Sequence, residues 1–209
     1  MKFIDISLPI RDGMMTYPQN PAVNIVRAPH PSARISRITV GSHTGTHIDA
    51  PLHVLAKGRG VDVYPLAQLS GPARVLDCTA VSEMIMPDHL KRFQIRRGQR
   101  ILLKTKNSLR GFKKFRRDAI GINGNSARYL AGCGIQLVGI DSLSIKRPGV
   151  DDPEAHLALL RKRIPILEGL NLSKVNPGTY DLLCLPLLLP GLDGAPCRAV
   201  LVENLEFRK

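Results

Sequence analysis

Short runs of Val, Ile and Leu recur along the chain and predict a fold with more strand than helix. Each run is bounded by Gly, Pro or Asp, as strands usually are. The runs expected to form strands cover residues 24–28, 35–41, 74–78, 100–105, 135–140 and 198–203, with 180–185 as a further candidate. The hydrophobic pattern therefore indicates several short strands, most of them built from buried aliphatic side chains.

Helical spacing is less common. Leu157, Leu160 and Ile164 fall on one face of residues 155–163, and basic side chains lie opposite. A second helix is expected over residues 125–131, with Asn123 or Asn125 as its cap and Gly132 as its stop, and a shorter one over 87–93. The combined pattern predicts the α/β class, in a mixed and strand-rich domain with a few helices.

The chain has 209 residues, of which 44% are hydrophobic, so it can bury a sizeable core. It contains no internal repeat and no long linker, and residues 1–209 are expected to form a single domain. The first ten residues lack the apolar run of a signal peptide. The most apolar stretch, residues 182–192, carries two prolines and is about half of a membrane span. We therefore expect a cytoplasmic protein without membrane association.

Basic residues outnumber acidic ones and give a formal net charge of +13. Residues 91–117 contain 12 Lys or Arg and no acid, with Phe112 and Phe115 among them. Such a run is typical either of a solvated surface or of a region that binds nucleic acid. We favour the solvated surface and expect no nucleic-acid partner. The alternative is a basic, nucleic-acid-associated domain.

Candidate chemistry is concentrated in one segment. His43, His47, Asp49 and His53 lie within eleven residues, although the chain has only six histidines. Imidazole and carboxylate groups are ligands that suit Zn²⁺, Mn²⁺ or Fe²⁺. We therefore expect a metal site. The alternative is a structural cluster of hydrogen-bonded His and Asp, and the isolated His30 and His89 are interpreted as structural.

The spacing of these four residues argues against a regular element. A straight strand would place His43 and His53 about 33 Å apart at roughly 3.3 Å per residue. A helix would turn Asp49 about 200° away from His47. We therefore predict a strand that ends near Ser42, followed by an irregular, curled ligand loop that contains Gly45.

The segment HTGTHIDAPLH, residues 43–53, resembles the cyclase-type family of metal-dependent hydrolases, which includes bacterial kynurenine formamidase and isatin hydrolase. It matches the family signature HxGTHxDxPxH at every fixed position. Supporting segments extend the resemblance over nearly the whole chain: IDISLP at 4–9 with Tyr17 and Pro18, Gly71-Pro72, VGID at 138–141 before Ser144, HLALL at 156–160 with Glu168, and DGAPCRA at 193–199.

This resemblance implies a swivelling β/β/α fold and a role for each matching residue. His43, His47 and Asp49 match metal ligands, and His156 and Glu168 match ligands of a second metal. His53 matches a catalytic acid–base residue. Tyr17 matches an aromatic side chain that binds the substrate ring. The metal would be Zn²⁺ first and Mn²⁺ second, with one or two ions, in a homo-oligomer (dimer or tetramer).

The sequence also departs from the family pattern at three places. Gln19-Asn20 follows Pro18 where Gly-Asp is usual, Thr46 stands where formamidases commonly have Ala, and Lys146 replaces an acid. None of these changes removes an expected ligand.

The expected function is a metal-dependent amidohydrolase acting on non-peptide C–N bonds, of the arylformamidase kind. A bound metal lowers the pKa of water from about 15.7 toward 7 and so provides hydroxide to attack an amide carbonyl. His53 would protonate the leaving nitrogen. The expected substrate is a small aryl formamide or cyclic amide. A lactone is a further alternative, because the same ligands would activate either electrophile.

Overall fold

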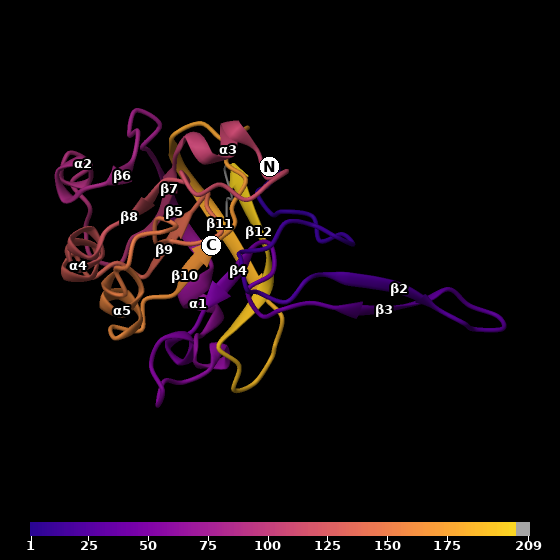
Figure 1. Ribbon diagram of the computed structural model, residues 1–209. Helices are drawn as coiled ribbons and strands as arrows, with labels where there is room; N and C mark the ends of the chain where they lie inside the picture. The colour runs from indigo at the N-terminus through magenta and orange to yellow at the C-terminus, as the bar shows by residue number, and fades with distance from the viewer. Residues whose placement is uncertain (204–209) are drawn as a thin grey trace.

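The computed structural model describes residues 1–203, which are built around one large mixed sheet (Figure 1). The strands are β1 (Lys2–Asp5), β2 (Asn24–Ala28), β3 (Ile35–Thr39), β4 (His47–Asp49), β5 (Gly71–Asp77), β6 (Met84–Ile85), β7 (Arg100–Lys104), β8 (Gly121–Ile122), β9 (Leu137–Ile140), β10 (Ile166–Glu168), β11 (Gly178–Pro186) and β12 (Gly194–Glu203). The helices are α1 (Leu66–Leu69), α2 (Pro87–Lys91), α3 (Lys106–Arg110), α4 (Gly124–Gly132) and α5 (Glu154–Leu160), with 3-10 turns η1 (Pro51–His53) and η2 (Val61–Val63).

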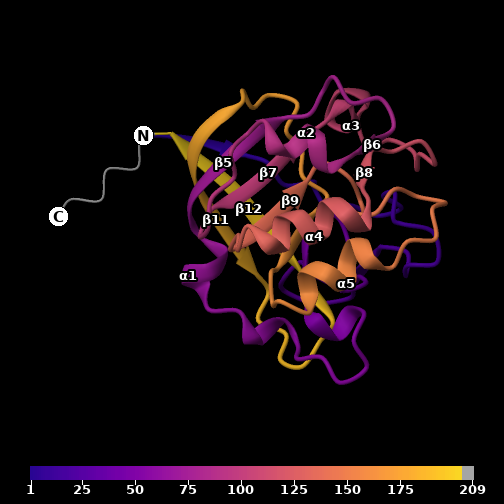
Figure 2. The same cartoon turned by 90° about the vertical axis from the view of Figure 1, so that its left-hand side faces the viewer.

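Seven strands of the large sheet close into a barrel-like ring. Their order is β12-β11-β5-β7-β9-β10-β4, and β4 also pairs with β12, while β1 adds to the far end of β12. Strands β5, β7, β9 and β10 run parallel, and the remaining pairings are antiparallel. Parallel neighbours need a crossover connection, usually a helix. Here α4 leads into β9 and α5 leads into β10, and Figure 2 shows both helices on one face of the sheet.

The core has two parts, one on each face of the parallel strands. Between the strands and the helices, Leu103 and Ile140 pack in one cluster with Leu130 of α4 and Leu159 of α5. Inside the ring, Leu102 and Leu137 belong to a second cluster with Ile48, Leu182 and Leu201. Strand β9 is therefore buried at all four positions, as expected for a parallel strand covered on both faces.

Strand β4 closes the ring and fixes the register of the site. It pairs antiparallel with β10, so that His47 lies opposite Glu168. On its other side it pairs with β12, where Asp49 lies opposite Gly194. Alternate residues of a strand point to one face, so His47 and Asp49 project to the same side. Glu168 joins them there because directly opposed residues share a face.

The β2–β3 hairpin projects away from this body (Figure 1). Every residue of β3 is exposed, and Ile38 keeps 60% of its surface accessible. The hairpin joins the segment that carries Tyr17 to the segment that carries His43. Its two ends therefore lie next to residues that the sequence assigns to the site.

The structure confirms the predicted fold class, a strand-rich α/β domain of the swivelling β/β/α type. Each predicted strand and helix occurs, with boundaries shifted by a few residues, and Asn123 is the cap of α4 because its side chain accepts a hydrogen bond from the Ser126 amide. The hydrophobic pattern missed the short strands β4 and β10. Each has only three residues, and their His, Asp and Glu side chains conceal the apolar pattern of a buried strand.

Candidate metal centre and active site

Four of the predicted site residues form a buried group at the point where the ring closes. His47 and Asp49 come from β4, Glu168 from β10 and His156 from α5, and each keeps at most 8% of its surface exposed. His47 Nε2 lies 3.4 Å from Asp49 Oδ1 and 3.3 Å from Glu168 Oε2. His156 Nε2 lies 3.4 Å from Glu168 Oε1. The structure thus joins the downstream His156 and Glu168 to the first cluster, which their spacing in the sequence did not predict.

The other two histidines lie on either side of β4. His43 comes from the turn before the strand, and His53 is the last residue of η1, which begins at Pro51. The ring centroids of His43 and His53 are 4.1 Å apart, and those of His53 and His156 are 5.5 Å apart. His53 is the most exposed of these histidines. It therefore faces the open side of the cluster.

The prediction of a wholly irregular ligand loop was wrong in its central part. The preceding strand ends at Thr39, and residues 47–49 form a strand that pairs on both sides. The chain does curl before this strand, where Gly45 adopts a φ of +62° that favours glycine. It turns again at Pro51. The predicted ligands are gathered because a short strand lies between two turns and because β10 supplies Glu168 from the neighbouring strand.

Close backbone packing also positions this group. Gly169, which follows Glu168, has a φ of +68°, and a Cβ atom there would collide with the carbonyl of Gly45. Thr46 Oγ1 bridges the same region, since it donates to the Gly169 carbonyl at 2.6 Å and accepts from the Leu8 amide at 2.7 Å. Thr46 therefore fixes the turn before β4 through hydrogen bonds with two backbone groups.

The carboxylates and histidines perturb one another strongly. Burial by itself lowers the pKa of His47, but the nearby carboxylates of Asp49 and Glu168 outweigh it and raise that pKa to about 10. Burial raises the pKa of Asp49, but the hydrogen bond from His43 and the nearby imidazole of His47 hold it well below its usual range. His53 differs from the other histidines, because desolvation lowers its pKa more than Asp49 raises it.

A backbone hydrogen bond fixes the orientation of His47. Its Nδ1 donates to the Gly45 carbonyl at 3.0 Å, and its Nε2 faces the carboxylates of Asp49 and Glu168. This arrangement fixes the tautomer and direction of the ring, as backbone carbonyls do for many metal-binding histidines. Within residues 1–203, His47 Nε2 and Asp49 Oδ2 are buried and have no hydrogen-bond partner.

These residues fit a divalent metal. Two ligands of a tetrahedral ion lie about 3.4 Å apart when each is about 2.1 Å from the ion, and the contacts of His47 with Asp49 and Glu168 match that spacing. Two ligand sets are close enough to hold an ion: His47, Asp49 and Glu168 form one, and His43, Asp49 and His53 form the other. Asp49 belongs to both sets. Histidine and carboxylate donors suit transition metals such as Zn²⁺ and Mn²⁺.

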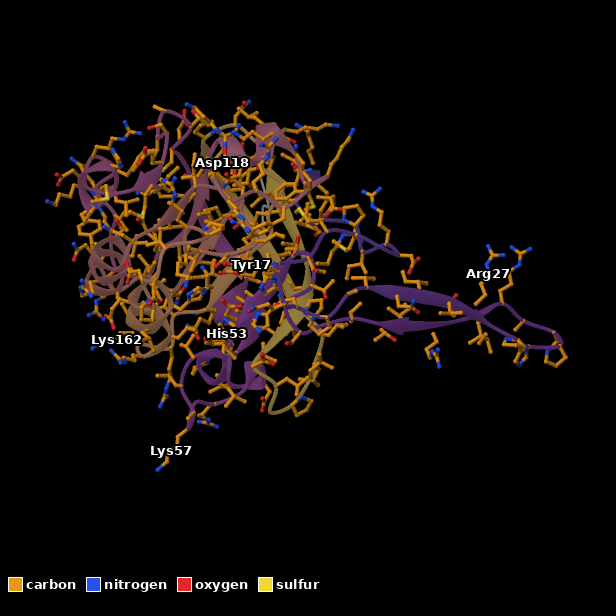
Figure 3. The ribbon with its side chains drawn as sticks, viewed as in Figure 1. Tyr17, Arg27, His53, Lys57, Asp118 and Lys162 are labelled. Atoms are coloured by element: carbon orange, nitrogen blue, oxygen red, sulfur yellow. The ribbon has the colours of Figure 1, made fainter. Side chains whose placement is uncertain are left out.

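A pocket of about 310 Å³ opens beside the cluster. Its walls include the imidazoles of His43, His47, His53 and His156, and residues 17–20 and 143–146 form much of the rest. Tyr17 packs edge-on against Phe115, with ring centroids 5.3 Å apart. Figure 3 shows Tyr17 and His53 in the central part of the molecule, well away from Arg27 on the projecting hairpin. The structure thus brings Tyr17 to the pocket wall, where the resemblance placed an aromatic residue.

The sequence did not single out Asp193 as a site residue, but the structure places it beside His43. His43 Nε2 lies 2.8 Å from Asp193 Oδ2, and its Nδ1 lies 2.8 Å from Asp49 Oδ1. The sequence offered one indication of this role: Asp193 is the acid at the start of the DGAP segment, immediately before β12. His30 and His89 lie outside the site and accept local hydrogen bonds from the amides of Ser32 and Met86.

Comparison with known proteins agrees with this fold and site. A kynurenine formamidase from Salinibacter ruber (strain DSM 13855 / M31) is 36% identical over 206 residues, which cover 96% of this chain and 97% of that protein. A protein described as a predicted metal-dependent hydrolase from Bacillus stearothermophilus superimposes with a TM-score of 0.86 at 37% identity, over 96% of this chain and 97% of that one. Isatin hydrolase A from Ralstonia solanacearum shares the fold, with a TM-score of 0.82 at 23% identity, over 97% of this chain and 92% of that one.

The closed mixed sheet and the buried His and carboxylate cluster, together with these relatives, identify a metal-dependent hydrolase that acts on amide C–N bonds, as the sequence predicted. Its family can be stated more narrowly. The Cyclase family model matches residues 4–147, and the chain belongs to that family.

Proposed function

We propose that this protein hydrolyses the amide bond of a small aryl formamide or cyclic amide, in the manner of an arylformamidase. The kynurenine formamidase relative supports this substrate class. The pocket of about 310 Å³ supports it too, since that volume is at the lower end of small-molecule sites.

One observation carries the proposal. His47 Nε2 and Asp49 Oδ2 are buried without hydrogen-bond partners in the described residues, and both belong to the cluster on the pocket wall. A buried polar atom without a partner costs free energy unless a ligand satisfies it. His47, Asp49, Glu168 and His156 are the residues we assign to one divalent metal. His43, which shares Asp49 with them, is the further ligand that a second ion would use.

When bound, a divalent metal supplies a Lewis acid that polarises the amide carbonyl and makes water more acidic. Zn²⁺ is the metal we expect first and Mn²⁺ second. We assign the proton transfers to His53, whose ring nitrogen would take a proton from water and return it to the leaving nitrogen. Its exposed position on the pocket side supports this role, because the other histidines are more deeply buried. The ring of Tyr17 would pack against the aromatic part of the substrate.

A direct test is a hydrolase screen with metal-supplemented protein. Protein prepared with Zn²⁺ or Mn²⁺ would be offered an aryl formamide, a cyclic amide and a lactone of similar size. We expect metal-dependent hydrolysis of one of the two amides that exceeds hydrolysis of the lactone. Turnover of the lactone alone would assign the protein to cyclic esters, and the absence of turnover on all three would refute the proposed function.

The competing interpretation was a basic nucleic-acid-associated domain with a structural His cluster. Within residues 1–203, His47 Nε2 and Asp49 Oδ2 have no hydrogen-bond partner, which argues against it, since a structural cluster would satisfy its buried polar atoms. The basic segment is also connected with the pocket, because Phe115, within that segment, packs against Tyr17 at the pocket wall. We therefore propose a small-molecule substrate and not a nucleic acid as the partner.

Two further expectations complete the proposal. We propose a homo-oligomer, either a dimer or a tetramer, and a cytoplasmic location. Exposed apolar side chains at Val26, Ile35 and Ile38 on the projecting hairpin are compatible with subunit contacts. Among the described helices, none is long and apolar enough to cross a membrane.

A further inference from the structure

Lys146 lines the metal pocket from a firmly fixed backbone. The preceding amide, that of Ile145, donates to Glu168 Oε1 at 2.6 Å, and the Ile145 carbonyl accepts from the Ile122 amide at 2.8 Å. Lys146 also forms a bridge with Ile122. The side chain of Lys146 then joins the histidines and Glu168 in the pocket wall. The backbone at Lys146 is thus fixed in part by a hydrogen bond to Glu168, which we assign to the metal.

The charge of Lys146 has no partner within the protein described. Lys146 is half-buried, and in residues 1–203 its ammonium group forms neither an ion pair nor a hydrogen bond. The adjacent Arg147 differs, because it pairs with Glu83 at 3.6 Å. A positive charge would oppose the binding of a cation nearby. Lys146 is therefore placed to meet an anion and not to assist the metal.

Further basic residues line a cavity that adjoins the metal pocket beyond Tyr17. Tyr17, Leu143 and Ser144 line both the metal pocket and an adjoining cavity. The adjoining cavity is also lined by Phe112, Phe115, Lys114 and Arg116. Within the described chain, Arg116 Nε is buried and has no hydrogen-bond partner. The basic segment thus surrounds an aromatic wall next to the site, and its field would attract an anionic molecule toward it.

We infer that Lys146 binds a carboxylate of the substrate, and that the preferred substrate is a small aromatic amide that carries a carboxylate near its scissile bond. This inference rests on the proposed function and specifies its substrate class. The aromatic ring would lie against Tyr17, and the carboxylate would pair with the Lys146 ammonium. Ammonium–carboxylate hydrogen bonds are about twice as strong as neutral ones, which makes the pairing a basis for selectivity.

The test compares formanilide with 2-, 3- and 4-formamidobenzoate, three aryl formamides that differ from formanilide only in the carboxylate. Metal-loaded wild-type protein should show a kcat/KM at least about 10-fold higher for one formamidobenzoate than for formanilide. Lys146→Met should lower kcat/KM for that isomer by about 10- to 100-fold, mainly through KM, and change formanilide by less than about 2-fold. Lys146→Glu should lower kcat/KM for the same formamidobenzoate further.

Arg147→Met is the matched control, since Arg147 pairs with Glu83 outside the pocket. It should leave the preference for formamidobenzoate unchanged. Two results would overturn the role of Lys146. One is a wild-type protein without preference among these substrates, and the other is a Lys146→Met variant that loses activity equally on formanilide and on the preferred formamidobenzoate. Equal effects of Arg147→Met and Lys146→Met would also refute it, because they would indicate a general field and not a contact.

Binding measurements separate this inference from the proposed function. If neither an aryl formamide nor a cyclic amide is hydrolysed, the proposed function fails, and calorimetric titration with 3-aminobenzoate and aniline still tests Lys146. Metal-loaded wild-type protein should bind 3-aminobenzoate more tightly than aniline, and Lys146→Met should abolish the difference. Unchanged binding of 3-aminobenzoate by the variant would refute the carboxylate subsite.

Discussion

Glu168 lies directly opposite His47 in the pairing of β10 with β4, and Glu168 Oε2 is 3.3 Å from His47 Nε2. The two residues are 121 positions apart in the sequence (168 − 47) and reach each other only because β4 closes the ring. Asp49, two residues after His47, completes the group on the same face. The pairing register of the sheet therefore determines how these three side chains are arranged. Substitutions of these side chains should affect metal binding before they affect the fold.

Replacing Asp49 by Asn should abolish tight metal binding. Asp49 is common to both ligand sets, so its loss removes a charged donor from each. We expect metal affinity to fall by more than about 100-fold, since even residues that only orient a ligand are worth about 10- to 100-fold. Competition with a chelating dye would measure the metal affinity of the variant. Asp118→Asn, at an exposed site, is the control, and retention of wild-type affinity by Asp49→Asn would contradict the assignment.

His53→Ala should separate catalysis from metal binding. Loss of a general acid–base residue lowers kcat by about 10²- to 10⁴-fold. We expect such a decrease on an aryl formamide, with metal content by elemental analysis unchanged, and no effect of His30→Ala. His53 is also close enough to Asp49 and His43 to act as a ligand. Parallel loss of metal and activity would therefore assign His53 to the metal.

Asp193→Ala should weaken metal binding without removing a ligand. Asp193 Oδ2 lies 2.8 Å from His43 Nε2 and orients the ring. Loss of such an orienting acceptor costs about 10- to 100-fold in metal affinity. Asp193→Asn retains an acceptor and should lose less, so the order wild type, Asn, Ala is expected in equilibrium metal titrations. Equal affinity of all three proteins would show that Asp193 does not position His43.

Metal affinity should increase with pH. In the metal-free protein, the buried His47 has its pKa raised to about 10 by Asp49 and Glu168, so it is protonated at neutral pH. Metal binding must displace that proton, and the apparent affinity should therefore rise by about tenfold per pH unit for each proton released. Calorimetry at pH 7 in buffers of different ionisation enthalpy would count the protons. Binding without proton release would contradict the protonated state of His47.

Phe115→Ala should weaken the binding of aromatic substrates. The edge-on contact with Phe115 holds Tyr17 at the pocket wall. Aromatic pairs contribute about 0.5–1.5 kcal/mol, so we expect KM for an aryl formamide to rise by about 2- to 12-fold with kcat nearly unchanged. Phe115→Tyr keeps the ring and should behave like wild type. A decrease in kcat alone would place Phe115 in a different role.

Much of the fold could be predicted from the hydrophobic pattern, because the long central strands are built from aliphatic runs. Strand β7, for example, is almost entirely buried and reads as Arg-Ile-Leu-Leu-Lys. Strands β4 and β10 could not be predicted in this way. Each is three residues long, and its identity depends on pairing with strands distant in the sequence.

The site was predictable as a list of residues but not as an arrangement. The density of histidines around Asp49 and the family resemblance selected the six residues expected at the metal and at the acid–base position. Tertiary pairing alone reveals how His156 and Glu168 join them, and why Asp193 contacts His43. The departures at Asn20 and Lys146 were visible in the sequence, but their position on one pocket wall was not.

The sources of the pocket residues have a consequence for how such enzymes diversify. The proposed ligands His47, Asp49, Glu168 and His156 come from paired strands and a packed helix, whereas segments 17–20 and 143–146 lie outside the named strands and helices. Loop segments tolerate substitution better than the scaffold that carries them. A single replacement in these two segments can therefore change which molecule is accepted while the chemistry stays intact, so new substrate preferences should arise in few evolutionary steps.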